Sequence, residues 1–411
     1  SFETLLSYGP KRTAPKYDSD LVAAYTFGFL PIHFPKVAEL LSQRFRHKDF
    51  PEKLRVLDLG CGPGTASLSC QYFFALLANA RTMYGEHKHR YRLDIVQIDR
   101  NEQFLEEARK LSEAFLPSKD NVVSTIEKQH LMDLHPENPS ALDFLGERTF
   151  DLILVQDFFG EMRELSVGKR KELLDALSNL CNDEGSLLIV ERTLGGRVQE
   201  FHQLVSKALQ GEGCHLFAPC PGIFDAPHGV KCYSCRASLH RSIVRPRFLE
   251  LLCRASSQYD YESIDENNLW CYAILGRNNL SAAPPLPSDL KDFSQLSNLS
   301  GQGSETPERV NLLASVAARL PDKPNTYKLC DQSCGSEYNR LHIPGGRLIG
   351  EFQRGDVLEL RSIRVEKEED PDEGTILLHL YVDGSSNISN LSRENRRVSW
   401  RDCLEGLGYR A

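Results

Sequence analysis

Residues 56–65 read Val-Leu-Asp-Leu-Gly-Cys-Gly-Pro-Gly-Thr, and this stretch decides the fold. Its first part is apolar apart from Asp58, as in a short buried strand. Gly60, Gly62 and Gly64 then follow at alternate positions, so the backbone can turn tightly and approach a ligand without side-chain clash. A helix that begins after this turn points its free N–H groups at the ligand. The stretch therefore predicts a strand–turn–helix unit with a cofactor at the turn.

The sequence around this unit alternates between strand-like and helix-like patterns. Strands are expected at 54–59, 93–99, 122–128, 150–156, 186–192 and 269–276, and helices at 18–47, 66–83, 101–115, 169–181 and 246–256. Such alternation predicts an α/β fold with a Rossmann-like, doubly wound and mostly parallel sheet. We expect the strand at 269–276 to return to the edge of that sheet.

The length of 411 residues is too great for one ordinary core and predicts more than one domain. We expect an N-terminal helical segment at 1–50 and a cofactor-binding domain at 51–278. That domain includes a cysteine-rich loop at 214–240. Residues 279–307 are rich in Ser, Asn and Pro and are expected to form a linker. Residues 308–411 alternate apolar and polar positions, which predicts a small antiparallel β module.

Composition limits the class of protein. The net charge of −8 argues against a surface that binds nucleic acid everywhere, although local basic patches are compatible with it. No run approaches 18 consecutive apolar residues, so we expect no membrane span and no membrane partner. Twelve irregularly spaced cysteines indicate thiols or metal ligands in a reducing compartment. The chain lacks an initial Met, consistent with a tag or targeting segment removed before residue 1.

The glycine turn favours one cofactor over another. Dinucleotide enzymes carry GxGxxG, whereas this chain has GxGxG with Asp58 two places before the first glycine. That form is typical of class I S-adenosylmethionine-dependent methyltransferases. Asp99, at the end of the second strand, is expected to accept hydrogen bonds from both ribose hydroxyls. Asp133 is expected near the adenine amino group, and Gln156, at the end of the fourth strand, completes the cofactor-binding set.

Cysteines after residue 213 indicate a metal centre. Cys232 and Cys235 form a CxxC, Cys220 lies between two prolines, and Cys330 follows in a distant segment. Four thiolates fit either a structural zinc or an iron–sulfur cluster, and spacing does not choose between them. Cys214 and Cys334 are alternative fourth ligands. A redox-active CxxC among scattered buried thiols is the other interpretation.

Together these residues resemble the Rsm22-type, methyltransferase-like family of ribosomal small-subunit assembly proteins, which has mitochondrial and bacterial members. The resemblance rests on matching segments in the same order at 57–66, 187–193, 218–221, 232–238 and 327–330. It implies a four-iron four-sulfur cluster held by Cys220, Cys232, Cys235 and Cys330. It also implies binding to small-subunit ribosomal RNA, in the mitochondrial matrix or the cytoplasm, by a chain that is monomeric outside the ribosome. The chain departs from the family pattern at 222–226, which has no cysteine, and at 231–234, which reads Lys-Cys-Tyr-Ser.

No sequence motif identifies the molecule that would accept a methyl group. Residues 157–159 read Asp-Phe-Phe and only approximate the (Asn/Asp)-Pro-Pro-(Tyr/Phe) of amino-methylating enzymes. Five basic residues near the CxxC form a stretch suited to phosphates: Lys231, Arg236, Arg241, Arg245 and Arg247. Three alternative functions are compatible with these residues: an RNA-directed methyltransferase, a non-catalytic assembly factor, or a small-molecule methyltransferase with a lid held by a zinc ion.

Overall fold

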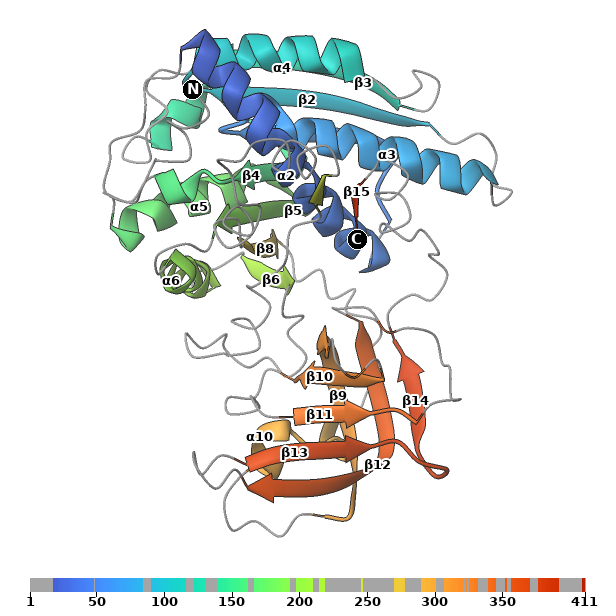
Figure 1. Ribbon diagram of the computed structural model, residues 1–411. Coiled ribbons are helices and arrows are strands. Elements are labelled where there is room, and N and C mark those ends of the chain that lie inside the picture. Colours follow the sequence, from blue (N-terminus) through green and yellow to red (C-terminus); the bar gives the residue numbers. More distant parts are fainter. Residues whose placement is uncertain are drawn as a thin grey trace, which may run out of the picture. The chain divides into compact units, whose positions relative to one another are not determined.

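The computed structural model describes residues 18–47, 49–83, 90–115, 122–130, 139–161, 166–192, 197–209, 214–218, 245–246, 270–277, 290–300, 307–320, 323, 325–331, 339–344, 352, 356–369, 376–391 and 409–410. These residues belong to two compact units. The first is built on a seven-stranded sheet and the second on a six-stranded sheet (Figure 1).

The first sheet has the strand order β3-β2-β1-β4-β5-β8-β6. Its strands are β1 (Lys53–Leu59), β2 (Tyr91–Asp99), β3 (Val122–His130), β4 (Phe150–Gln156), β5 (Cys181–Arg192), β6 (His215–Ala218) and β8 (Trp270–Gly276). Strands β3, β2, β1, β4 and β5 pair in parallel, and β8 pairs antiparallel to β5. The expected Rossmann-like α/β class is therefore confirmed, and the order with an antiparallel strand after β5 is that of the methyltransferase fold.

Strand β8 differs from expectation in position. It lies between β5 and β6 and not at the edge of the sheet. All seven of its residues are buried, as in a strand with neighbours on both sides. The short strand β6 takes the edge position, and its four residues lie in a region where the sequence pattern predicted no regular element.

Helices pack on this sheet: α2 (Ser19–His47), α3 (Thr65–Met83), α4 (Glu102–Phe115), α5 (Val167–Leu180) and α6 (Arg197–Leu209), with the short 3-10 turns η1 (Pro139–Leu145) and η2 (Phe159–Glu161). Helix α2 includes Pro31 and Pro35 and is long and apolar enough, by length and composition alone, to cross a membrane. However, 67% of its apolar window is buried inside the protein, as in a core helix. A two-residue strand β7 (Arg245–Pro246) pairs with β15 (Tyr409–Arg410), so the end of the chain returns to the first unit.

The second unit is a small barrel. Its strands are β9 (Arg309–Arg319), β10 (Thr326–Cys330), β11 (Asn339–His342), β12 (Val357–Glu369), β13 (Ile376–Tyr381) and β14 (Asn387–Asn390). The order β13-β11-β10-β9-β12 closes on itself because β12 also pairs with β13, and β14 extends β12. The expected β module is thus confirmed, with one correction: β11 and β13 are parallel. A closed five-stranded order with this single parallel pair is that of the OB-type Greek-key barrel.

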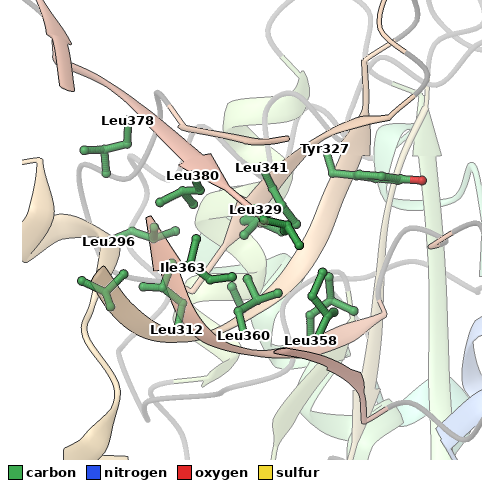
Figure 2. Close-up of a cluster of buried hydrophobic side chains, with 14 of the residues drawn as sticks. Leu296, Leu312, Tyr327, Leu329, Leu341, Leu358, Leu360, Ile363, Leu378 and Leu380 are labelled. Atoms are coloured by element: carbon green, nitrogen blue, oxygen red, sulfur yellow. The ribbon is translucent and has the colours of Figure 1, made fainter. Parts of the chain in front are cut away.

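Apolar side chains from alternate positions fill the barrel. Figure 2 shows the leucines of β9 to β13 converging on one core, with Tyr327 at its margin. Leu296 and Leu299 also belong to this core, although they lie in the segment expected to be a linker. They are three residues apart in the one-turn helix α10 (Leu296–Leu299), so both face the same way and pack together on the barrel.

Candidate functional site

The site lies at the carboxyl ends of β1 and β4. In the sheet, β1 has β2 on one side and β4 on the other, so the strand order reverses between β1 and β4. Ligands of open α/β sheets bind in the crevice at such a switch point. Two turns flank it here, one after Leu59 and one after Gln156.

The turn after β1 has the backbone shape that its three glycines predict. Gly60, Gly62 and Gly64 have φ values of 66°, 52° and 78°, a region that residues with a Cβ rarely adopt. The backbone N–H groups of Gly60 and Cys61 donate to the carbonyl of Ile98, at 2.9 and 3.0 Å, which joins the turn to β2. The predicted strand–turn–helix unit is confirmed, with α3 beginning at Thr65.

Asp58 lies in β1, and its carboxyl group is hydrogen-bonded to the start of α3. Its Oδ2 accepts hydrogen bonds from the backbone N–H of Ser67, at 3.0 Å, and from the Ser67 hydroxyl. Burial raises the pKa of Asp58 to about 7, although these hydrogen bonds oppose the shift. The carboxyl group thereby fixes the start of the helix that follows the turn.

Asp99 supports the glycine turn directly. Its Oδ2 accepts from the backbone N–H of Gly62 and its Oδ1 from that of Asn101, both at 2.8 Å. Its side chain is buried, and burial raises the pKa of the carboxyl while the two backbone hydrogen bonds lower it. Each oxygen keeps a second lone pair for a ribose hydroxyl. The predicted ribose contact stays a prediction, and the structure adds a role in holding the turn that the sequence did not reveal.

A small cavity of about 30 Å³ opens at the switch point. One side is formed by the first turn and the start of α3, through Asp58, Gly60, Cys61, Gly62, Pro63, Thr65 and Ala66. Tyr25, His33, Gln156 and Asp157, from α2 and the end of β4, also line it. Gln156 was predicted to bind cofactor, and it does line the cavity; its Nε2 donates to the backbone carbonyl of His33, at 3.0 Å.

His33, Lys36 and Asp157 form a buried polar cluster, and His33 and Asp157 line the cavity. His33 Nδ1 lies 2.7 Å from Asp157 Oδ2 and 3.0 Å from Lys36 Nζ. Arg192 Nε lies 3.4 Å from Asp157 Oδ1. The side chains of His33 and Asp157 are 4% and 7% exposed, so the contact is shielded from bulk water. No local sequence pattern points to His33 or Lys36 as site residues.

The charges of this cluster are set by its burial. Burial and the charge of Lys36 lower the pKa of His33 to about 4, against the opposing influence of Asp157, so the imidazole is neutral at pH 7. Burial lowers the pKa of Lys36 to about 8. Burial alone would raise the pKa of Asp157, but His33 and the cations of Lys36 and Arg192 outweigh it and lower that pKa. A neutral imidazole therefore faces an ionised carboxylate.

Glu191 fixes the turn that presents Asp157. Its two carboxyl oxygens accept the backbone N–H groups of Phe159, at 2.7 Å, and Gly160, at 3.0 Å. Asp157 itself has a φ of 54°, unusual for a residue with a side chain, and its N–H donates to the carbonyl of Val190 at 2.8 Å. Burial, and next the charge of Asp157, raise the pKa of Glu191 to about 8. Strained backbone held by buried polar groups is characteristic of functional sites.

Several predicted site residues lie outside the described residues: Asp133, Cys220, Cys232, Cys235 and the alternative ligand Cys334. Cys330 is described and is buried in β10. Cys214 is also buried, and its Sγ lies 3.9 Å from the Ser178 hydroxyl, which fits a core thiol. Within the part of the chain that is described, no three His, Cys, Asp or Glu side chains are grouped to hold a metal ion. The metal-ligand set therefore stays a prediction.

A scan against protein-family models and a search among curated proteins gave no match. Solved structures of methyltransferases do resemble the chain. An S-adenosylmethionine-dependent methyltransferase from Clostridium acetobutylicum is 14% identical over 48% of this chain and 63% of its own, with a TM-score of 0.28. An rRNA methylase from Streptococcus thermophilus is 13% identical over 58% and 95%, also at 0.28. TrmN from Thermus thermophilus is 20% identical over 44% and 42%, again at 0.28.

These similarities are limited in extent. The match spans less than two thirds of the Clostridium chain and less than half of TrmN. At such identities and scores they say nothing about substrate. The strand order of the sheet and the geometry of the glycine turn carry the assignment of the fold.

Proposed function

We propose that this protein binds S-adenosylmethionine at the turn after β1 and acts as a methyltransferase on RNA of the small ribosomal subunit. The observation that carries the proposal is the glycine turn with positive φ at three positions, held by Asp99 and open to a cavity at the switch point of the sheet. Helix α3 directs its free N–H groups to the same place, which suits an anionic or oxygen-rich ligand. When bound, the cofactor supplies an electrophilic methyl group.

The barrel supports RNA as the partner. Leu341 and Leu380 face the core, so their neighbours His342, His379 and Tyr381 are on the outer face. The ring of His342 stacks on those of Tyr381 and His379, at 4.8 and 5.1 Å between centroids. Arg364 lies 4.6 Å from the Tyr381 ring and pairs with Glu366, and His379 pairs with Glu368. Half-buried rings beside a guanidinium are typical of surfaces on which bases of single-stranded nucleic acid stack.

The proposal includes a four-iron four-sulfur cluster and membership of the Rsm22-type family. Its support is the order of motifs in the sequence, from the glycine turn to Cys330. Cys330 would hold the cluster together with Cys220, Cys232 and Cys235. The burial of Cys330 suits a cluster ligand, since iron–sulfur centres are shielded from water. We also propose that the protein acts in the mitochondrial matrix or the cytoplasm.

Two measurements test this function. Calorimetric titration of the purified protein with S-adenosylmethionine is expected to show one site, and unchanged heat would contradict the cofactor assignment. Sedimentation with small ribosomal subunits across a salt series is expected to show binding that weakens as salt rises. A protein that never co-sediments, even at low salt, is not a ribosomal factor.

The same measurements separate the three functions considered. Transfer of a labelled methyl group to small-subunit rRNA indicates the enzyme. Binding of cofactor and subunits without transfer indicates a non-catalytic assembly factor. Cofactor binding without any RNA binding indicates a small-molecule methyltransferase. Absorbance near 400 nm in anaerobically purified protein distinguishes an iron–sulfur cluster from zinc.

A further inference from the structure

Glu191 is buried near the end of β5, and its side chain binds the backbone of the turn after β4. We propose that Glu191 is a positioning residue for cofactor binding: by holding this turn, it keeps the ring of Phe158 against Gly60 and so fixes the shape of the glycine turn. This inference rests on the proposed function, because the property that it concerns is the affinity for S-adenosylmethionine.

The carboxyl group of Glu191 is the acceptor for two N–H groups of the turn. Its Oε1 accepts from the backbone N–H of Phe159 at 2.7 Å, and its Oε2 accepts from that of Gly160 at 3.0 Å. These bonds extend the pairing of β4 with β5, since the N–H of Asp157 donates to the carbonyl of Val190 at 2.8 Å. An ionised carboxylate accepts at both oxygens, whereas a side-chain amide offers one acceptor and one donor. The turn therefore fits a carboxylate at position 191 and does not fit an amide of the same size.

Burial makes the position of the turn depend on these two hydrogen bonds. Glu191 is 3% exposed and Phe159 is 2% exposed, so bulk water does not replace the carboxylate if it is lost. A buried N–H group left without an acceptor costs the full penalty of its desolvation. The turn also contains Asp157 at a φ of 54°, a strained conformation that persists only where the surrounding structure holds it. Loss of the Glu191 carboxylate is therefore expected to let the turn relax to another shape.

The turn places the half-buried ring of Phe158 on the cofactor loop. Phe158 lies between Asp157 and Phe159, and the N–H groups of both neighbours are anchored to β5. Its ring fills the space in which a side chain at Gly60 would lie. Gly60 has a φ of 66° and lines the cavity. Direct contacts thus connect Glu191, through the turn and Phe158, to the loop that would hold the cofactor.

Other ionisable groups surround Glu191 and decide the pH at which it is tested. Burial, and next the charge of Asp157, raise the pKa of Glu191 to about 8, although the two N–H groups of the turn and the charge of Arg192 oppose the shift. Lys36 on α2 and Cys271 on β8 also interact with it electrostatically. Experiments at pH 9 therefore examine the ionised form, which accepts both hydrogen bonds.

The first test is a double-mutant cycle, measured by calorimetric titration at pH 9 with S-adenosylhomocysteine, the cofactor without its methyl group. Glu191→Gln turns one acceptor into a donor that faces an N–H group, so affinity should fall roughly 2- to 30-fold. In a Phe158→Ala background the same change should cost less than about twofold, because no ring is left to position. Glu172→Gln, at an exposed residue of α5 that pairs with Lys169, is the matched control and should bind normally.

The cycle separates this inference from the proposed function. An affinity that Glu191→Gln leaves unchanged, or lowers equally with and without the Phe158 ring, overturns the positioning role. Wild-type protein that does not bind S-adenosylhomocysteine removes the proposed function instead.

The second test reads the turn by NMR and does not require that Glu191→Gln folds. Labelling with carbonyl-¹³C phenylalanine and ¹⁵N glycine selects Phe–Gly steps, and the sequence has two, which end at Gly28 and Gly160. Phe27→Leu, at an exposed side chain, removes the Gly28 signal and thereby identifies the other. S-adenosylhomocysteine should shift the Gly160 signal of the wild type, and this shift should be lost in Phe158→Ala. A Gly160 signal that does not respond to the ligand, or that responds equally without the Phe158 ring, overturns the proposal.

Discussion

The ring of Phe158 occupies the space where Gly60 would carry a side chain. A Cβ built on Gly60 lies 2.4 Å from Phe158 Cδ2, closer than real Cβ contacts allow. The turn after β4 is thereby packed against the turn after β1, in addition to the pairing of the two strands that lead into them. Movement of Phe158 would alter the cofactor loop, and a side chain at position 60 would displace the turn that presents Asp157.

Gly60→Ala is therefore expected to weaken S-adenosylmethionine binding at least tenfold, through a steric clash added to an unfavourable φ of 66°. Gly146→Ala is the matched control: its φ is 57°, its Cβ would meet nothing within 4 Å and it does not line the cavity, so only the backbone strain applies. Calorimetric titration of both variants measures the difference. Phe158→Ala in the Gly60→Ala background should restore part of the affinity, and equal losses in the two single variants would contradict the packing argument.

A second prediction concerns Asp99. Asp99→Ala removes the acceptor of the Gly62 and Asn101 N–H groups as well as the proposed ribose contact. Loss of hydrogen bonds to a charged group costs about 1.5–3 kcal/mol, so cofactor affinity should fall roughly 10- to 150-fold. Because the same hydrogen bonds hold the turn, the melting temperature without cofactor should fall as well. Unchanged affinity in calorimetry would refute the ribose assignment.

Much of the first unit was predictable because its signals are local. The glycine turn, the parallel strands and the length of α2 follow from periodicity within single segments, and the structure confirms them. Cys70, Cys181 and Cys271 are buried among the apolar side chains of this unit. The position of β8 between β5 and β6 depends on pairing with a strand distant in sequence, so no local pattern predicts it.

The His33–Asp157 contact was missed for the same reason. Its two members come from α2 and from the turn after β4, and only the packed structure brings them together. A weak signal was present in the sequence. His33 and Lys36 are polar, three residues apart, and thus share one face of a helix whose apolar neighbours are buried. Paired polar positions on a core face indicate a buried polar partner, although they do not identify it.

A third prediction follows from the lowered pKa of His33, which is about 4 when folded and 6.5 in an ordinary histidine. Between these values the unfolded chain binds a proton that the folded protein does not. The contribution of His33 to stability is therefore complete above pH 6.5 and is lost as pH falls towards 4, by about 3 kcal/mol. His33→Asn has no such group, so urea unfolding of both proteins from pH 7 to pH 4 should show their difference shifting in favour of the variant. A constant difference would contradict a neutral buried imidazole.

A fourth prediction concerns the cysteines. Cys220→Ser, Cys232→Ser and Cys235→Ser should each lower iron content and melting temperature together, because a ligand-held loop folds with its metal. Cys330→Ser should do the same if it is the fourth ligand. Cys70→Ser is the control and should keep full iron content, because this thiol is buried in α3 and is not among the candidate ligands. Full metal occupancy in all three of the first variants would refute the metal centre.

The last prediction separates two ways of binding RNA. Reversing Arg241, Arg245 and Arg247 to Glu should weaken binding to small subunits and flatten its dependence on salt, because phosphate contacts release counterions. A control variant with the same change of charge reverses three exposed basic residues to Glu. They are Arg109, Arg148 and Lys169, which already pair with Glu106, Glu127 and Glu172. This variant should bind small subunits as the wild type does.

Tyr381→Ala should act differently, because it removes a ring from the stack on the barrel and no charge. Base stacking contributes about 1–3 kcal/mol, so affinity should fall roughly 5- to 150-fold at every salt concentration while the slope stays unchanged. Tyr381→Phe keeps the ring and should bind like the wild type. If Tyr381→Ala also binds normally while the triple arginine variant does not, the RNA contacts the protein through phosphates alone, and the outer face of the barrel serves another purpose.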